Sequence, residues 1–330
     1  MRKQRVVCAV AILAVTLGMS AASADKARLT SHAEMMSRLA TLETVSFLSG
    51  SHRIKVVCIG RSVKGKDIPM VAVSDPNVPI ELTKRLFIIC RQHGDEPAST
   101  EAMLNLIEDL AFAADERTAD LMSKVSFFVV PMVNPDGAGR YQRRNANKAD
   151  LNRDWLTLGQ PETRCVRAAI DAIAPDVLID QHELGPGANR TDFVETAGTA
   201  SGASADVVSE CLELQRLVIG MLRTHDMGVV SYQTGENHLP RLAHRYFPIH
   251  GNTTTLLFET RQSGMREYQL QYRMRLHIVG TMTVAKYLAG QGDELRQRIA
   301  QHDSWRKRVL LASRKKAPRQ AKGSAARRKR

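Results

Sequence analysis

Several patterns that mark common protein functions are missing from this sequence. It has no glycine-rich phosphate loop and no internal repeat, which argues against a nucleotide-binding loop and against a repeat architecture. Its five cysteines include no C-x-x-C spacing, so we assign none of them to a metal. Four of the five lie beyond the N-terminal segment, and their spacing allows either one or two disulfides or buried free thiols: Cys58, Cys90, Cys165 and Cys211.

Long apolar runs are also scarce, and the only notable one lies at the N-terminus. Three basic residues precede an uncharged run over residues 6–24, which ends in small residues. A basic head, a short apolar middle and an Ala-x-Ala ending are typical of a secretory signal peptide cleaved after Ala24. The apolar part is too short to span a bilayer comfortably. We therefore expect residues 1–24 to be removed, no membrane span to remain, and the mature protein to be periplasmic or secreted.

The formal net charge of +13 is distributed very unevenly. Residues 303–330 hold twelve Lys or Arg against one Asp and contribute +11, the signal segment contributes +3, and residues 25–302 therefore carry −1. The basic tail has no aromatic residue after Trp305, and its composition predicts a disordered extension. Such a tail could adhere to an anionic wall polymer or to lipid headgroups. Nucleic acid is not expected as the main partner of an exported protein.

The order of apolar patterns predicts an α/β fold. Strands alternate with helices, which implies a mixed, mostly parallel central sheet covered by helices on both faces. The predicted strands cover residues 53–60, 68–73, 85–90, 125–133, 176–180 and 253–258. The predicted helices cover residues 31–48, 98–112, 162–173, 207–222 and 267–288.

Potential metal ligands and acids follow three of the predicted strands. His93 and Glu96 come just after the strand over residues 85–90, while His182 and Glu259 follow the strands that end at residues 180 and 258. Because ligands in such sheets sit beyond the carboxyl ends of the strands, we expect these side chains to meet at one edge. Among them, His93 and Glu96 supply an imidazole and a carboxylate three residues apart, which could converge on one divalent metal ion.

Seven short motifs occur in a specific order between residues 60 and 261. This ordered set resembles the zinc carboxypeptidases of the carboxypeptidase A superfamily, peptidase family M14. The resemblance implies a catalytic domain over residues 25–302 with three α/β/α layers. The motifs are Gly60-Arg61-Ser62 with Gly65-Lys66, His93-Gly94-Asp95-Glu96, Asn134-Pro135-Asp136-Gly137, Arg143-x-Asn145, Asp150-Leu151-Asn152-Arg153, Asp180-x-His182 and Phe258-Glu259-x-Arg261.

The resemblance also implies a metal site. By it, His93, Glu96 and His182 are the ligands of one Zn²⁺ ion, and Asp150 corresponds to the carboxylate that holds the first histidine. Such a carboxylate would fix the tautomer of the imidazole and make it a better donor. Taken alone, Asp150 could equally be a helix cap or a turn residue.

Four further residues receive roles by the same resemblance. Glu259 matches the catalytic glutamate, which takes a proton from the zinc-bound water and delivers one to the leaving amine. Arg143 aligns with the arginine that stabilises the oxyanion, with Arg144 as its rival. Asn152 and Arg153 align with the pair that binds the terminal carboxylate of the substrate.

The sequence departs from the family pattern at several places. Glu183 stands after His182, where the digestive enzymes carry Ser, and we expect it to affect a subsite. The substrate-contacting tyrosine has no secure match, because Tyr232 and Tyr246 both have the wrong spacing. The preference for the C-terminal side chain therefore stays open.

The preferred hypothesis is a zinc carboxypeptidase that removes the last residue of exported peptides with a free carboxylate. A second hypothesis is a cell-wall muropeptide amidase or carboxypeptidase with the same zinc site. Deacylation of small N-acyl amino acids is disfavoured by the signal segment and by the complete Asp150-Leu151-Asn152-Arg153 run. A non-catalytic wall-binding protein is disfavoured because all the expected ligands and acids are present.

Overall fold

A computed structural model describes residues 29–185, 191–235, 240–262 and 267–316. The expected signal segment and the last residues of the basic tail, 317–330, lie outside this described part. Within it, no helix has the length and apolar character that crossing a bilayer would require.

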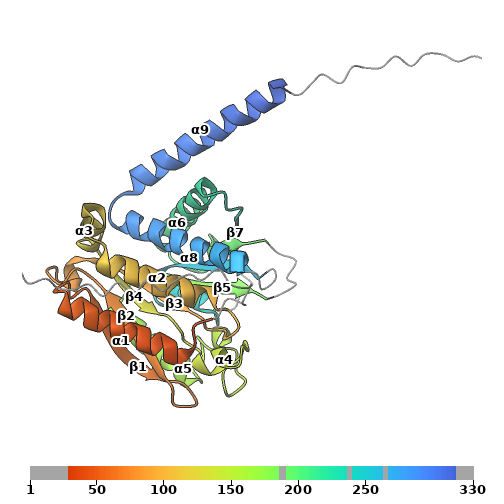
Figure 1. Cartoon of the computed structure of the whole chain (residues 1–330). Coiled ribbons are helices and arrows are strands. Elements are labelled where there is room, and N and C mark those ends of the chain that lie inside the picture. The colour runs from red at the N-terminus through yellow and green to blue at the C-terminus, as the bar shows by residue number, and fades with distance from the viewer. Residues whose placement is uncertain (1–28, 186–190, 236–239, 263–266, 317–330) are drawn as a thin grey trace, which may run out of the picture.

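The elements form an alternating α/β series (Figure 1). The strands are β1 (Ile54–Arg61), β2 (Asp67–Val73), β3 (Lys84–Cys90), β4 (Val125–Val130), β5 (Val177–Leu184), β6 (Phe193–Ala197), β7 (Val230–Thr234) and β8 (Thr254–Arg261). The helices are α1 (His32–Leu48), α2 (Ala98–Phe112), α3 (Glu116–Met122), α4 (Pro135–Ala138), α5 (Pro161–Ile173), α6 (Ala205–Thr224), α7 (Ala243–His250), α8 (Glu267–Leu288) and α9 (Gly292–Lys316). Two short 3₁₀ turns complete the described part, η1 (Ile80–Leu82) and η2 (Leu151–Arg153).

The described strands form one mixed sheet of eight, in the order β1-β2-β4-β3-β5-β8-β6-β7. The central neighbours β4, β3, β5 and β8 run parallel, whereas the pairs β1/β2, β2/β4 and β6/β8 are antiparallel. The predicted α/β fold with a mixed, mostly parallel sheet is thereby confirmed. Because β3, β5 and β8 run parallel, their carboxyl ends lie at the same edge of the sheet. The loops that follow these three strands are therefore close together.

Side-chain alternation builds one apolar core on each face of the sheet. In β3, Leu86 and Ile88 pack with α1, α2, α6 and α8, while Phe87 and Ile89 face α5 and α7. Because β3 is buried on both faces, its sequence is a continuous apolar run and does not alternate between apolar and polar residues. The two cores give the three α/β/α layers expected from the sequence.

Two of the central strands extend further than the sequence predicted. His182 and Glu259 lie inside β5 and β8 rather than after them, and they are direct register partners across the parallel pair. Backbone pairing continues to Leu184 and Arg261 because each strand supplies a ladder for the other. This pairing fixes the two side chains side by side, on the face of the sheet that α5 and α7 cover.

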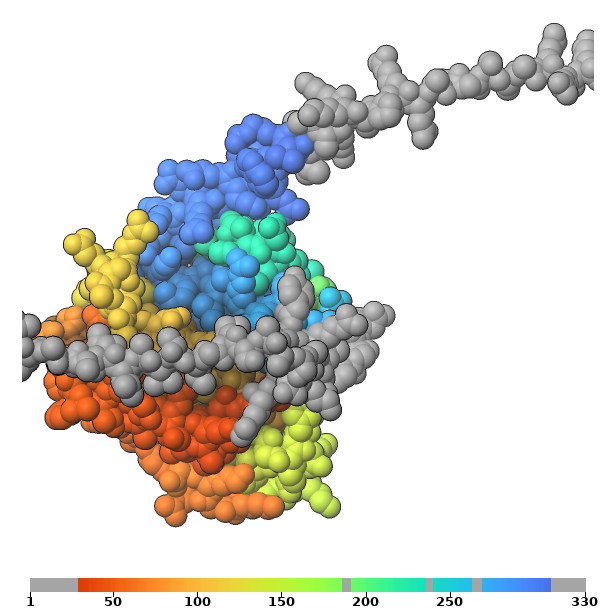
Figure 2. All heavy atoms as spheres, viewed as in Figure 1, coloured from red at the N-terminus to blue at the C-terminus, as the bar shows by residue number. Residues whose placement is uncertain are grey.

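The basic tail corrects one expectation from the sequence. Residues 303–316 belong to α9, which projects from the body (Figure 1 and Figure 2), so this part is helical and not disordered. Leu295 is buried and Ile299 partly buried where the first turns of α9 pack on α6, which provides a nucleus for the helix. Helix growth from a nucleus is cooperative, and residues 303–316 contain no Pro or Gly to stop it.

A close backbone approach positions the loop after β3. Gly94 lies against the α4 turn, and a Cβ added at Gly94 would stand 2.1 Å from the carbonyl carbon of Gly137 and 2.2 Å from Ala138 N. Only glycine fits there, because both obstacles are main-chain atoms that cannot rotate away. The approach therefore ties the loop that carries His93 to the turn that leads to Arg143.

Replacing Gly94 with Ala should lower the free energy of unfolding by about 1–3 kcal/mol, because the added methyl group must push two backbone segments apart. Denaturant unfolding of the purified protein measures this change. Gly228→Ala is the matched control, since a Cβ there meets no atom within 4 Å. Equal stability of the two variants would contradict the close approach.

Candidate metal centre

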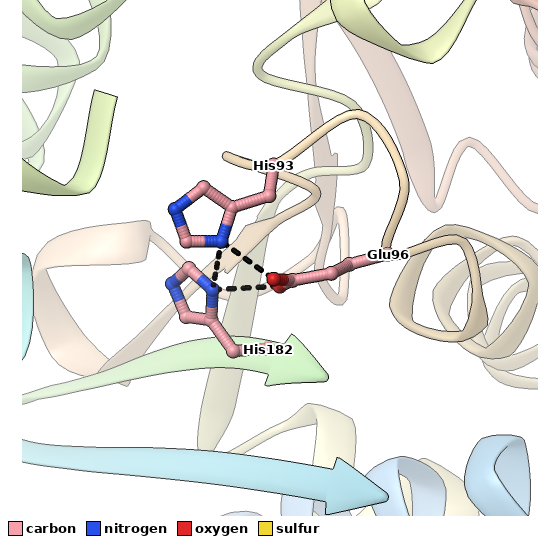
Figure 3. Close-up of side chains that lie close together, drawn as sticks. All are labelled: His93, Glu96 and His182. Carbon is pink, nitrogen blue, oxygen red and sulfur yellow. Dashed lines mark hydrogen bonds and ion pairs between the residues drawn. The ribbon is translucent and has the colours of Figure 1, made fainter. Parts of the chain in front are cut away.

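Three side chains from separate parts of the chain converge on one point (Figure 3). His93 and Glu96 belong to the loop between β3 and α2, and His182 lies near the end of β5. His93 Nδ1 lies 2.6 Å from Glu96 Oε1 and 3.1 Å from His182 Nδ1. His182 Nδ1 lies 2.8 Å from Glu96 Oε2, and all three residues are buried. The structure thus brings together the three residues that the sequence assigns to the metal.

The far nitrogen of each imidazole faces an aspartate. His93 Nε2 lies 3.0 Å from Asp150 Oδ1, and His182 Nε2 lies 3.0 Å from Asp180 Oδ1. A carboxylate only accepts hydrogen bonds, so each Nε2 carries the proton and donates it. Both Nδ1 atoms are then left with a lone pair that points at the shared point.

This arrangement fits a bound cation. Two imidazole lone pairs and the carboxylate of Glu96 are all acceptors, and acceptors held this close repel one another unless positive charge lies between them. Their ligand atoms lie within 4.8 Å of one another. Two neutral imidazoles and one carboxylate form a usual donor set for Zn²⁺ and leave a fourth position open. The donors present therefore suit one zinc ion.

The electrostatics of the centre favour positive charge. Burial opposes ionisation of Glu96, but the two neighbouring imidazoles outweigh it and hold the pKa of its carboxyl well below the usual range. Burial likewise disfavours the imidazolium form of His93 and His182, yet the surrounding carboxylates raise the pKa of both. The same field that attracts protons to the two imidazoles would attract a divalent cation.

Arg143 borders the centre from the loop after α4. Its Nε and Nη2 atoms bind Asp150 Oδ2 at 3.1 Å and 3.0 Å, and its Nη1 lies 3.1 Å from His93 Nδ1. The rival Arg144 instead donates to the main-chain carbonyl of Lys148 at 2.9 Å. The structure therefore places Arg143, and not Arg144, beside the candidate ligands.

Glu259 occupies the position beside His182 on the neighbouring strand. Its Oε2 atom is buried and has no hydrogen-bond partner among the described residues. Burial is the main cause that raises the pKa of Glu259 to about 7, although nearby His182 opposes the rise. A half-buried carboxylate with one buried, unpaired oxygen is poised to exchange protons near neutral pH.

Asn152 and Arg153 differ in how accessible their side chains are to a substrate. The Asn152 amide is buried, with its oxygen accepting from Ala243 N at 3.0 Å and its nitrogen 3.0 Å from His182 Nε2. Arg153 is exposed and donates to the main-chain carbonyl of Asn152 at 2.7 Å. Asn152 therefore packs behind a candidate ligand, while Arg153 faces outward.

Residues 46–213 match the family model described as zinc carboxypeptidase, Peptidase_M14. The chain belongs to the zinc carboxypeptidase family. The matched segment contains the three candidate ligands but ends before Glu259. The chain is 32% identical over 152 residues to carboxypeptidase 2 of Trichophyton tonsurans, a match that covers 45% of this chain and 26% of that protein. It thus spans about a quarter of the length of the curated fungal relatives that it matches.

Solved structures show the same fold. A metallo-carboxypeptidase from Burkholderia cenocepacia superposes with a TM-score of 0.64 at 22% identity, covering 78% of this chain and 68% of that one. Thrombin activatable fibrinolysis inhibitor superposes with a TM-score of 0.67 at 17% identity, covering 80% of this chain and 75% of that one. Because both sequence identities are low, these two matches show only that this zinc carboxypeptidase family member shares their fold.

The structure changes the interpretation of Glu183. Because successive residues of a strand face opposite sides, the side chain of Glu183 points away from His182 and into the layer of α2 and α8. There it is buried, pairs with Arg273 and accepts a hydrogen bond from Ala98 N at 2.6 Å. The expectation that Glu183 affects a subsite is therefore wrong.

Neither candidate tyrosine gains support from its contacts. Tyr246 packs edge-on against Phe247 and lies under the guanidinium of Arg167, and Tyr232 packs edge-on against Phe193. The sequence left open whether the cysteines beyond the N-terminal segment form disulfides. In the described structure all four of them are free thiols.

A buried polar network that no sequence motif indicated lies behind His182. Gln92 Nε2 donates to Asp180 Oδ1 at 2.6 Å, and Trp155 Nε1 donates to Gln92 Oε1 at 2.7 Å. On the other side of Asp180, His244 of α7 lies 3.7 Å from Asp180 Oδ2 and 3.2 Å from Glu195 Oε1. Burial lowers the pKa of His244, but the two carboxylates outweigh this effect and raise it.

Changing Asp150 to Asn should lower the zinc affinity of the protein about 10- to 100-fold, because the imidazole of His93 loses its anionic partner. Competition with a chromophoric chelator measures this affinity without any catalytic assay. Asp120→Asn, at an exposed site on α3 paired with Lys124, is the control that should leave affinity unchanged. An Asp150→Asn protein that binds zinc as tightly as the wild type would show that this aspartate does not support the centre.

Proposed function

We propose that this protein is a zinc-dependent carboxypeptidase that hydrolyses the C-terminal peptide bond of exported peptides. One observation carries the proposal. Three donors that suit zinc converge at one point, and Glu259 stands beside one of them on the neighbouring strand, half-buried and with its buried Oε2 atom unpaired among the described residues. An open metal position next to a proton carrier with a raised pKa is the arrangement that metal-assisted hydrolysis requires.

The chemistry divides between the metal and the side chains. Zn²⁺ bound by His93, Glu96 and His182 would polarise the scissile carbonyl and make a water molecule acidic enough to attack it. Glu259 would accept a proton from the attacking water and return one to the leaving amine. Its raised pKa, about 7, allows both steps near neutral pH, because neither protonation state is strongly favoured.

Two arginines would hold the negative charges of the substrate. Arg143 lies beside the candidate ligands, and its guanidinium would stabilise the negative oxygen that develops on the carbonyl. Arg153 would bind the terminal carboxylate, for which a planar guanidinium is well suited. Asn152 could assist only by using its second amide hydrogen or by leaving its contacts with Ala243 and His182.

A cell-wall muropeptide is the alternative substrate. The exposed Arg153 requires only a free carboxylate, which ordinary peptides and wall stem peptides both offer. Incubating the protein with both kinds of peptide and identifying the products by mass spectrometry separates the two proposals. Cleavage of the wall peptides alone would favour the muropeptide amidase or carboxypeptidase.

Exchanging Glu259 for Gln should reduce kcat by about 10²–10⁴-fold, because the amide cannot carry the proton. Zinc content should stay at one ion per chain, since Glu259 is not among the candidate ligands. Removing zinc with a chelator should also abolish activity, and adding it back should restore it. The control is Glu116→Gln on the surface of α3. Full activity in the Glu259→Gln variant would end this proposal.

We also propose that residues 1–24 direct export and that residues 303–330 attach the protein to anionic wall polymer or lipid headgroups. Protein isolated from an exporting bacterial host should have a mass that begins at Asp25. It should bind anionic vesicles at low salt, and a variant ending at residue 302 should bind them much less. Retention of residues 1–24 would contradict the first proposal, and undiminished binding by the shortened variant would contradict the second.

A further inference from the structure

A hollow of about 750 Å³ opens beside the candidate metal centre. It is lined by Asp95 and by most of the loop that follows α4, residues 140–146 together with Lys148. This loop, which we call the basic loop (residues 139–149), reaches the surface in the yellow-green region of Figure 2. The hollow and the candidate metal centre share Arg143, which lines the hollow and contacts Asp150 and His93 at the centre.

The hollow has a strong excess of positive charge. Arg140, Arg143, Arg144 and Lys148 line it, against the single carboxylate of Asp95. The folded part of the chain, residues 25–302, carries only −1 in total, so this excess is local and does not reflect a generally basic domain. Local charge of one sign around a cleft attracts ligands of the opposite sign.

Three of these cations have no acidic partner among the described residues. Arg140 donates to the main-chain carbonyl of Asn145 at 3.4 Å, and Arg144 donates to that of Lys148 at 2.9 Å. These contacts orient the guanidinium groups without neutralising them. In the described structure no carboxylate lies within ion-pair distance of Arg140, Arg144 or Lys148, whereas Arg143 is paired with Asp150 and Glu96.

The basic loop is held in place by the hydrogen bonds of one buried side chain, Asn145. The buried amide of Asn145 accepts from Asn147 N and Ala149 N, both at 3.0 Å, and donates to Gln160 Oε1 at 2.9 Å and Glu162 Oε2 at 3.2 Å. The loop also holds two residues in the left-handed region, at φ +51° for Tyr141 and φ +61° for Lys148. Each such residue costs on the order of 1 kcal/mol and persists only where the surrounding contacts impose it. The backbone that carries the cations is therefore held in place around the hollow before any ligand arrives.

We propose that this hollow is a subsite for a carboxylate carried by the substrate residue on the acyl side of the scissile bond. This inference rests on the proposed function. In the proposed function, the scissile carbonyl lies at Arg143 and the terminal carboxylate at Arg153. The wall of the hollow includes Arg143 but not Arg153. The substrate residue that can enter the hollow is therefore the one before the scissile bond. A side-chain carboxylate there meets cations that lack an acidic partner. The preferred substrates are therefore acidic peptides.

The first measurement compares two peptides that differ only by Glu or Gln before the scissile bond. The Glu peptide should have the higher kcat/KM, by about five- to tenfold at low salt, because several exposed cations attract its carboxylate. The advantage should shrink toward one at about 1 M salt, where charges are screened over about 3 Å. This comparison needs no variant and so does not depend on a mutant folding correctly.

The second measurement uses the double variant Arg144→Gln/Lys148→Gln. The ratio of kcat/KM between the Glu and Gln peptides should fall toward one. The control, Lys55→Gln/Arg117→Gln, removes the same charge from exposed positions on β1 and α3 outside the hollow and should keep the wild-type ratio. An equal ratio in the wild type, the double variant and the control would overturn the subsite.

Binding distinguishes failure of the subsite from failure of the proposed function. Calorimetry with the Glu259→Gln protein should give tighter binding of the Glu peptide than of the Gln peptide. If neither peptide is cleaved by the wild type but this difference in binding remains, the hollow binds a carboxylate as proposed, while the peptidase proposal, and with it the assignment to the acyl side of a scissile bond, fails. If both peptides are cleaved equally well and bind equally well at low salt, the peptidase proposal stands and the subsite fails.

A third arm identifies the source of the carboxylate. The same comparison is made with a cell-wall stem peptide that contains γ-linked glutamate and with its form in which the free α-carboxylate is amidated. A carboxylate preference in the linear peptides alone assigns the subsite to ordinary acidic peptides. A preference in the wall peptides alone assigns it to wall material, and no preference in either series overturns it.

Discussion

The site depends on the mutual orientation of two imidazoles and one carboxylate around a single point. Asp150 and Asp180 accept the Nε2–H groups of His93 and His182, so both Nδ1 lone pairs must face Glu96. Such a group of acceptors is unfavourable by itself, and positive charge at its centre makes it favourable. Metal binding would therefore also stabilise the fold around it, because the three donors come from segments that meet only in the folded protein.

The parallel centre of the sheet supplies the precision that this orientation needs. The loop after β3 carries two of the donors, and register pairing of β5 with β8 places His182 beside Glu259. The alternation of side chains then assigns His182 to the face with α7 and Glu183 to the opposite face. Behind the centre, Gln92 donates to Asp180 and is itself held by Trp155, while His244 lies on the other side of Asp180. Beside it, the basic loop lines the hollow with positive charge.

Much of this could be predicted because it depends on local pattern. An apolar strand is followed directly by the polar residues His93 and Glu96, and further motifs follow in order up to Glu259. These patterns indicated the family, the fold and the residues that converge. Other features depend on tertiary packing, which the sequence does not display. Glu183 was misinterpreted because the strand continues past Asp180, and His244 gave no signal because its partners come from β5 and β6. The segment over residues 303–316 was misread because high charge predicts disorder even where helix propensity is good.

The central claim is that His93, Glu96 and His182 share one metal ion. X-ray absorption at the zinc edge tests it most directly on the mature protein loaded with one equivalent of zinc. The account predicts two imidazole nitrogens and carboxylate or water oxygen at about 2.0–2.2 Å, with no sulfur, and loss of one imidazole in the His182→Ala variant. A sulfur ligand, or an unchanged spectrum in that variant, would contradict the account.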